Sequence, residues 1–241
     1  MVSRASNSGA DRNANPCAGR RTGLQPGSRA DLREKPRRPL TSTLGVTLSP
    51  LHSVERMNYE EETEKEPFTP EMEAASLQIA LSRAPARLEE LASAQCDDDA
   101  FVHLPRSAAA AFHLGQLTEA KLYATRALAL APSYPDNWNY GNAIHLGHTV
   151  LGLLALNDQD PGTAITELHA SGQTPGSPQL NSFGPTMQLA KALLKLGYVE
   201  PVLAYIEHCR AFWEMGGTWL DLWERKIREG HVPNFFQHSY A

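Results

Sequence analysis

The chain has 241 residues, 41% of them hydrophobic and 20% charged, a balance that excludes global disorder and leaves room for a sizeable core. The formal charge of −5 is uneven: residues 1–56 carry ten Lys and Arg against four Asp and Glu, and residues 57–241 carry twelve against twenty-three. Because a polyanion requires a basic face, the acidic larger part excludes nucleic acid as the expected partner.

The composition also indicates a fold class and a compartment. Alanine, leucine and glutamate dominate the later part of the chain and β-branched runs are scarce, which favours an all-α fold. No apolar run approaches the roughly 20 residues of a membrane span, and no apolar segment follows the N-terminal arginines as in a secretory signal. Cys17, Cys96 and Cys209 have no paired spacing, which is typical of a reducing compartment. We therefore expect a cytoplasmic protein without membrane association.

Residues 1–66 are predicted to be disordered, first basic and then acidic. Residues 1–56 combine arginine pairs with scattered Ser, Gly and Pro and lack the periodic apolar residues that would offset ordering entropy. A basic tail that grips an acidic partner and an organelle transit peptide are two interpretations, although acidic residues weaken the second. At Met57 the composition changes to MNYEEETEKEP, so a native start there, with residues 1–56 absent from the native protein, is a third.

Residues 67–241 are predicted to form a helical domain. The first helix is expected to begin at Pro70 and end at Pro85, with a short partner over residues 86–95. A capping threonine and two acidic residues that suit the helix dipole support this start: Thr69, Glu71 and Glu73. An acidic triplet is predicted to cap the following helix: Asp97, Asp98 and Asp99.

The remaining helices follow from apolar periodicity and from turn residues. They are predicted over residues 100–114 (with a possible break at Pro105), 118–131, 142–156, 163–170, 186–196, 199–213 and 218–228. The segment 171–185, SGQTPGSPQLNSFGP, is the one long loop predicted, and loops of that length are usually functional or mobile. A lid over a site and a crossing between repeats are the two interpretations.

Small residues recur in three segments with similar spacing. They are Gly115, Ala120, Ala127 and Pro132; then Gly152, Ala155 and Ala164; then Ala190, Gly197 and Val202. This pattern resembles the tetratricopeptide (TPR) repeat over about residues 100–213, and the chain is similar to bacterial TPR-like proteins without an assigned activity. It departs from the family in two respects. Ala120, Ala164 and Val202 lie 44 and 38 residues apart, longer than the usual repeat of about 34, and the first-helix aromatic is replaced by Leu104, His148 and Thr186.

The resemblance implies a TPR-like α-solenoid of three to four antiparallel helical hairpins with a C-terminal capping helix. Small residues such as Gly152 and Ala190 would let neighbouring helices approach closely, and stacked hairpins would share one core. Residues 218–228 would form the cap. Its apolar face is predicted to carry Trp219, Trp223 and Ile227, with Phe235 and Phe236 packed back on it.

The resemblance also implies a non-catalytic module that binds a protein or peptide on a concave face lined by the first helix of each pair. The candidate partner-binding residues on that face are Asn139, Asn142, Thr149, Met187 and Lys191. The alternative is that the same strip packs against the long loop or a C-terminal helix.

We expect no catalytic residue, no metal and no cofactor. His145 and His148 share a helix face but have no further ligands at zinc spacing, and Cys209 aligns with a buried position of the repeat. Two other functions stay open: a hydrolase with a polar site under the 171–185 loop, and self-association through the aromatic C-terminal end. The hydrolase would use Asn142, His145 and Asn181, and self-association would use Trp219, Trp223 and Phe235.

Overall fold

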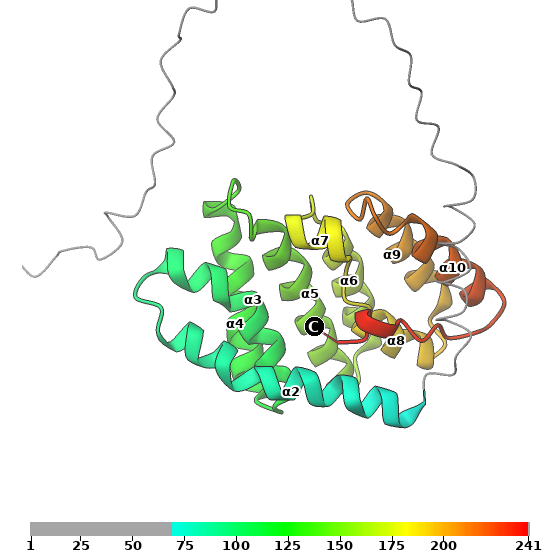
Figure 1. The fold of residues 1–241 in the computed structure, drawn as a ribbon, viewed down its shortest axis with the longest axis horizontal. Helices are drawn as coiled ribbons and strands as arrows, with labels where there is room; N and C mark the ends of the chain where they lie inside the picture. The colour runs from blue at the N-terminus through cyan, green and yellow to red at the C-terminus, as the bar shows by residue number, and fades with distance from the viewer. Residues whose placement is uncertain (1–68, 241) are drawn as a thin grey trace, which may run out of the picture. The chain divides into compact units, whose positions relative to one another are not determined.

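A computed structural model of the chain describes residues 69–240, which form α-helices joined by short turns and contain no β-strand (Figure 1). The all-α prediction is confirmed. The helices are α2 (Pro70–Ala92), α3 (Asp97–His113), α4 (Leu117–Leu130), α5 (Tyr140–Asn157), α6 (Pro161–Gly172), α7 (Pro178–Phe183), α8 (Gln188–Lys195), α9 (Val199–Arg210) and α10 (Gly217–Arg228). The predictions for residues 1–66, including the native start at Met57, lie outside the described residues, as does the side chain of Phe236.

Consecutive helices pack as pairs: α3 with α4, α5 with α6, and α8 with α9. The first helix of each pair contacts the first helix of the next, so that α5 touches both α3 and α8. The second helices α6 and α9 are also in contact, and α10 packs on α9. Helix α5 therefore lies at the centre of the packing, between α3, α4, α6 and α8 (Figure 1).

Small residues occupy the places where these helices approach, as predicted. A Cβ added at Gly152 on α5 would overlap the Leu189 side chain of α8 and lie 3.1 Å from the Glu167 Cβ of α6. The predicted small residues of α4, α6 and α8 have no or almost no exposed surface: Ala120, Ala164 and Ala190. Close packing of this kind is sensitive to a single added methyl group.

Helix α2 differs from the prediction, because it continues through Pro85 instead of ending there. A proline inside a helix removes one N–H donor and costs about 3 kcal/mol, but it does not forbid a helix that is held by packing on both sides. Ala80 and Ala84 are buried before the proline, and the hydroxyl of Ser107 on α3 donates to the carbonyl of Arg87 after it, at 2.8 Å. The separate helix over residues 86–95 is therefore wrong.

The start of α3 also corrects a prediction. Cys96 occupies the N-cap position, and the acidic triplet fills the first turn instead of capping it. Two of these carboxylates contact later parts of the chain: Asp97 pairs with Arg126 of α4 at 2.7 Å, and Asp98 accepts from the Tyr134 hydroxyl, in the turn after α4, at 2.6 Å. Pro105 lies inside α3 without breaking it.

The aromatic C-terminal end packs inside the same chain. Trp223, Ile227 and Phe235 are buried, Trp219 is partly buried, and the Trp223 and Phe235 rings meet edge to face at 5.1 Å between centroids. The prediction that Phe235 packs on the last helix is confirmed.

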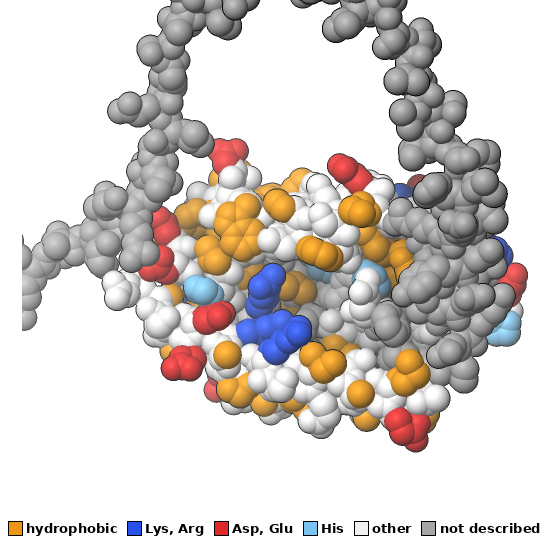
Figure 2. Space-filling model, in the orientation of Figure 1, with side chains coloured by type: hydrophobic (Ala, Val, Ile, Leu, Met, Phe, Trp, Pro, Cys, Tyr) orange, Lys and Arg blue, Asp and Glu red, His pale blue; other side chains and the backbone are white. Residues whose placement is uncertain are grey.

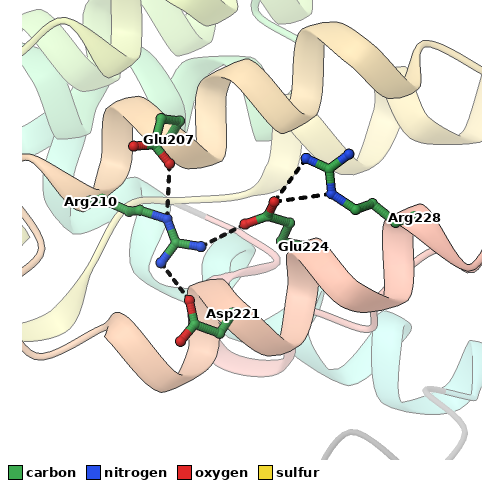
Figure 3. A network of polar contacts seen from close by, with 5 residues as sticks. All are labelled: Glu207, Arg210, Asp221, Glu224 and Arg228. Carbon is green, nitrogen blue, oxygen red and sulfur yellow. Dashed lines mark hydrogen bonds and ion pairs between the residues drawn. The ribbon is translucent and has the colours of Figure 1, made fainter.

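An ion-pair network joins α9 to α10 (Figure 3). The Arg210 guanidinium donates to Glu207 at 3.1 Å, to Asp221 at 2.6 Å and to Glu224 at 2.7 Å. Glu224 also accepts from Arg228 at 2.9 Å. Since Arg210 bridges two helices and Arg228 pairs only within its own, the two arginines contribute differently to stability.

We predict that Arg210→Met lowers the free energy of unfolding by about 1 kcal/mol, because two charge-assisted contacts across the α9–α10 interface and one within α9 are lost. The matched variant Arg228→Met should cost only about 0.3 kcal/mol, as expected for one exposed pair within a helix. Urea denaturation at low ionic strength measures both. Equal losses in the two variants would contradict a role for Arg210 in joining α9 to α10.

Candidate functional site

A cavity of about 300 Å³ opens on the face to which α3, α5 and the segment before α8 contribute. Arg106 of α3 lies on one side, Asn142 and His145 of α5 form part of its wall, and Phe183 of α7 lies at its exposed rim. The C-terminal segment, through Tyr240, also lines this cavity. Residues far apart in sequence therefore meet at one site.

The segment predicted as a long loop forms one wall of the cavity and contains a short helix, α7. Ser177 begins α7 by accepting from the Leu180 amide at 3.0 Å and donates its hydroxyl proton to Asn142 Oδ1 at 2.8 Å. Thr174 donates to the Gly141 carbonyl at 3.1 Å, and a Cβ at Gly141 would overlap the carbonyl of Gly176. The segment is thus held against α5 by hydrogen bonds and by direct backbone contact.

Two asparagines connect this wall to α3. The Asn139 amide nitrogen donates to the Phe101 and Val102 carbonyls at 3.0 and 3.2 Å. Asn142 donates to Asn139 Oδ1 at 3.0 Å and to Gln179 Oε1 at 3.1 Å. Buried amides satisfied in this way orient the helices that carry them.

His145 is buried and has a defined tautomer. Its Nδ1 lies 3.2 Å from the Ser171 carbonyl and must donate to it, while Nε2 accepts from the Thr186 amide at 3.1 Å. Burial lowers the pKa of His145 to about 4. A second proton on Nε2 would also oppose the Thr186 N–H, so the ring is neutral near pH 7 and links α6 to the start of α8.

The five predicted partner-binding residues are all buried, with exposed fractions from 0 to 7%. Asn139 and Asn142 belong to the amide network, and Asn142 alone of the five lines the cavity. Thr149 and Met187 lie in the interior. Contact of these five residues with a partner stays a prediction. In this conformation they contribute to the packing beneath the predicted binding face.

Lys191 lies under helix α2. Its Nζ is 3.3 Å from the Glu73 carboxylate, which Lys195 and the Tyr240 hydroxyl each approach to 3.5 Å. Burial opposes ionisation of Glu73, but Lys191 and Lys195 outweigh it and lower the pKa of the carboxyl. The N-terminal end of α2 and Tyr240, near the C-terminus, therefore both lie against α8, on the face predicted to bind a partner.

The residues of the hydrolase hypothesis also make structural contacts. Asn142 and His145 are hydrogen bonded as described above. The Asn181 amide nitrogen, in the orientation its neighbours require, donates to the Ser177 and Phe212 carbonyls at 3.0 and 2.9 Å. Cys209 is fully buried, as predicted, and burial raises the pKa of its thiol. His148 pairs with Glu167 of α6 at 2.7 Å.

Sequence reasoning missed the residues that give the cavity its chemistry. Arg106, Gln237 and Tyr240 line it, and none lies on the predicted strip. A signal did exist for α7, since a serine followed by a proline, as at Ser177 and Pro178, is a common helix start. No local pattern indicates that the C-terminal segment returns to α5.

No family model, no curated protein and no solved structure matches this chain. Within residues 69–240, none of the helices combines the length and apolar character needed to cross a bilayer. The function is therefore inferred from the geometry of the site.

We predict that His145 makes stability dependent on pH. Its pKa rises from about 4 in the folded chain to 6.5 on unfolding, so its contribution is complete above pH 6.5 and is lost as the pH falls towards 4. The loss amounts to at most about 3 kcal/mol. In urea denaturation, the stability difference between wild type and His145→Gln should be constant at pH 7–9 and shrink from pH 6.5 to pH 4. A difference that does not change with pH contradicts the assignment.

Proposed function

We propose that residues 69–240 form a TPR-like α-solenoid that binds a segment of a protein partner and carries out no catalysis. Three successive helix pairs support the solenoid, because each pair contacts the next through both its helices. Helix α10 then acts as the cap that covers the last pair. Besides the spacing and the missing aromatic, a further departure from the resemblance is α2, a single helix placed before the first pair.

The observation that carries the binding proposal is the cavity on the first-helix face. It is open to solvent, it receives side chains from α3 and α5, and Phe183 at its rim is 73% exposed. An exposed aromatic ring beside a cavity lined by both apolar and polar groups suits recognition of a peptide, in which an apolar anchor is flanked by hydrogen-bonding groups. The neighbouring Gln179 and Gln237 amides supply such groups.

The same geometry favours binding over the two alternatives. The three residues of the hydrolase hypothesis, Asn142, His145 and Asn181, are already hydrogen bonded within the chain, which is typical of a structural role. Two of the three aromatic residues proposed for self-association, Trp223 and Phe235, are fully buried in the chain itself. Phe183, in contrast, has most of its surface in solvent.

We predict that Phe183→Asp weakens partner binding at least about tenfold, because a charged group cannot replace an aromatic anchor. The full chain is immobilised, partners from its host lysate are identified by mass spectrometry, and affinities of the recovered partner are measured for each variant. Stability should change by no more than about 0.5 kcal/mol, since the ring is exposed.

The matched control is Leu122→Asp. Leu122 is 59% exposed on α4 and lines a separate groove formed by α4, α5 and α6. This variant should bind the partner like wild type. Equal affinity of wild type and Phe183→Asp, or equal losses in both variants, would contradict binding at the α3–α5 face.

A further inference from the structure

The described part of the chain is acidic, yet its central cavity is bordered by arginines. Residues 69–240 contain 11 Lys and Arg against 18 Asp and Glu, a net charge of −7. Figure 2 shows basic side chains gathered beside a hollow in the middle of this face; one acidic side chain lies next to them, and the other visible acidic side chains lie further out. Two adjacent cavities are lined by three arginines: Arg83 and Arg87 of α2 and Arg106 of α3.

The two cavities share Gln237 and Tyr240 and together form what we term the arginine cleft. The second cavity has a volume of about 220 Å³ and is lined by one stripe of α2, which includes Ser76, Ile79 and Arg83. Among residues 69–240, no Asp or Glu lines either cavity. The cleft is therefore basic and bordered by amides, hydroxyls and apolar surface.

Arg83 and Arg106 are both exposed, and no carboxylate of the described residues forms an ion pair with either. Other arginines of the domain do have such partners, as Arg126 and Arg210 show. Burial lowers the pKa of the half-buried Arg87, as do the charges of Arg106 and Arg83, while the charge of Glu90 raises it. Because Arg83 and Arg106 pair with no carboxylate of the described residues, an anion bound beside them would be stabilised.

We infer that the arginine cleft binds the acidic side chains of a peptide segment in a protein partner. Arg83 and Arg106 would each hold a carboxylate, for which the planar guanidinium group is well suited. Phe183, at the rim of the first cavity, would contact an apolar side chain of the same segment. This inference rests on the proposed function and adds the chemistry of the ligand.

The charge distribution favours an acidic peptide over a nucleic acid or a membrane surface with anionic headgroups. A long polyanion would also meet the acidic remainder of the domain, whereas a short acidic segment would meet only the cleft. The two cavities are small, which suits a few side chains of an extended chain and not a duplex.

The test uses the full chain and a short fluorescein-labelled peptide of alternating glutamate and leucine, together with the same peptide in which every glutamate is glutamine. Fluorescence anisotropy should show that the acidic peptide binds at least about tenfold more tightly than its amide counterpart. Arg83→Gln and Arg106→Gln should each weaken the acidic peptide about tenfold and leave the amide peptide unaffected.

Lys121→Gln is the control, because Lys121 is a cation of α4 that lines the separate groove with Asp158 and Asp160. It should bind both peptides like wild type. Equal binding of the two peptides by wild type overturns the inference but leaves peptide binding itself intact. Binding of neither peptide also overturns it, and the proposed function is then decided by the partner-capture experiment.

A further variant tests whether acidic residues of the same chain occupy the arginine cleft. Glu60, Glu61 and Glu62 precede α2 in the sequence and are changed together to Gln. Unchanged affinity for the acidic peptide supports a separate partner. A gain of about tenfold or more would reassign the cleft to these residues and overturn the inference of a partner segment.

Discussion

The close approach of α5 to its neighbours is the constraint on which the rest of the structure depends. Gly152 lets α6 and α8 pack on one part of the helix, and Gly141 lets the backbone at Gly176 rest directly on its first turn. The segment that carries α7 can therefore lie against α5, where Ser177 and Thr174 are hydrogen bonded. The cavity, its wall and its exposed Phe183 follow from this contact. A residue with a side chain at Gly141 would move the wall away.

Much of the fold was predictable because it depends on local patterns. Apolar periodicity located most of the helices, and the spacing of small residues identified Gly152 and the burial of Cys209. The failures have tertiary causes. Pro85 should end a helix by local rules, but contacts with α3 hold α2 together on both sides of it. A helix of six residues such as α7 is too short for a periodic signal.

The candidate site was predictable only in part. Helical spacing correctly grouped Asn139 and Asn142, but it could not show that the α7 segment covers them. It likewise could not show that α2 returns to α8, where Glu73 meets Lys191. Arg83 and Arg106 lie on different helices, so only the tertiary packing of α2 on α3 brings them together. Side-chain type and spacing therefore indicate a face, and the packing of distant segments decides which of its residues remain accessible.

The most direct test of this account is the stability of Gly141→Ala, measured by urea denaturation beside Gly162→Ala. A Cβ at Gly141 would overlap the Gly176 carbonyl, whereas at Gly162 on α6 the nearest heavy atom, Asp160 Oδ1, lies 3.5 Å away. Alanine favours a helix over glycine by up to about 1 kcal/mol, so Gly162→Ala should be neutral or stabilising. The account predicts that Gly141→Ala lowers the free energy of unfolding by about 2 kcal/mol or more. A Gly141→Ala variant as stable as wild type would contradict it.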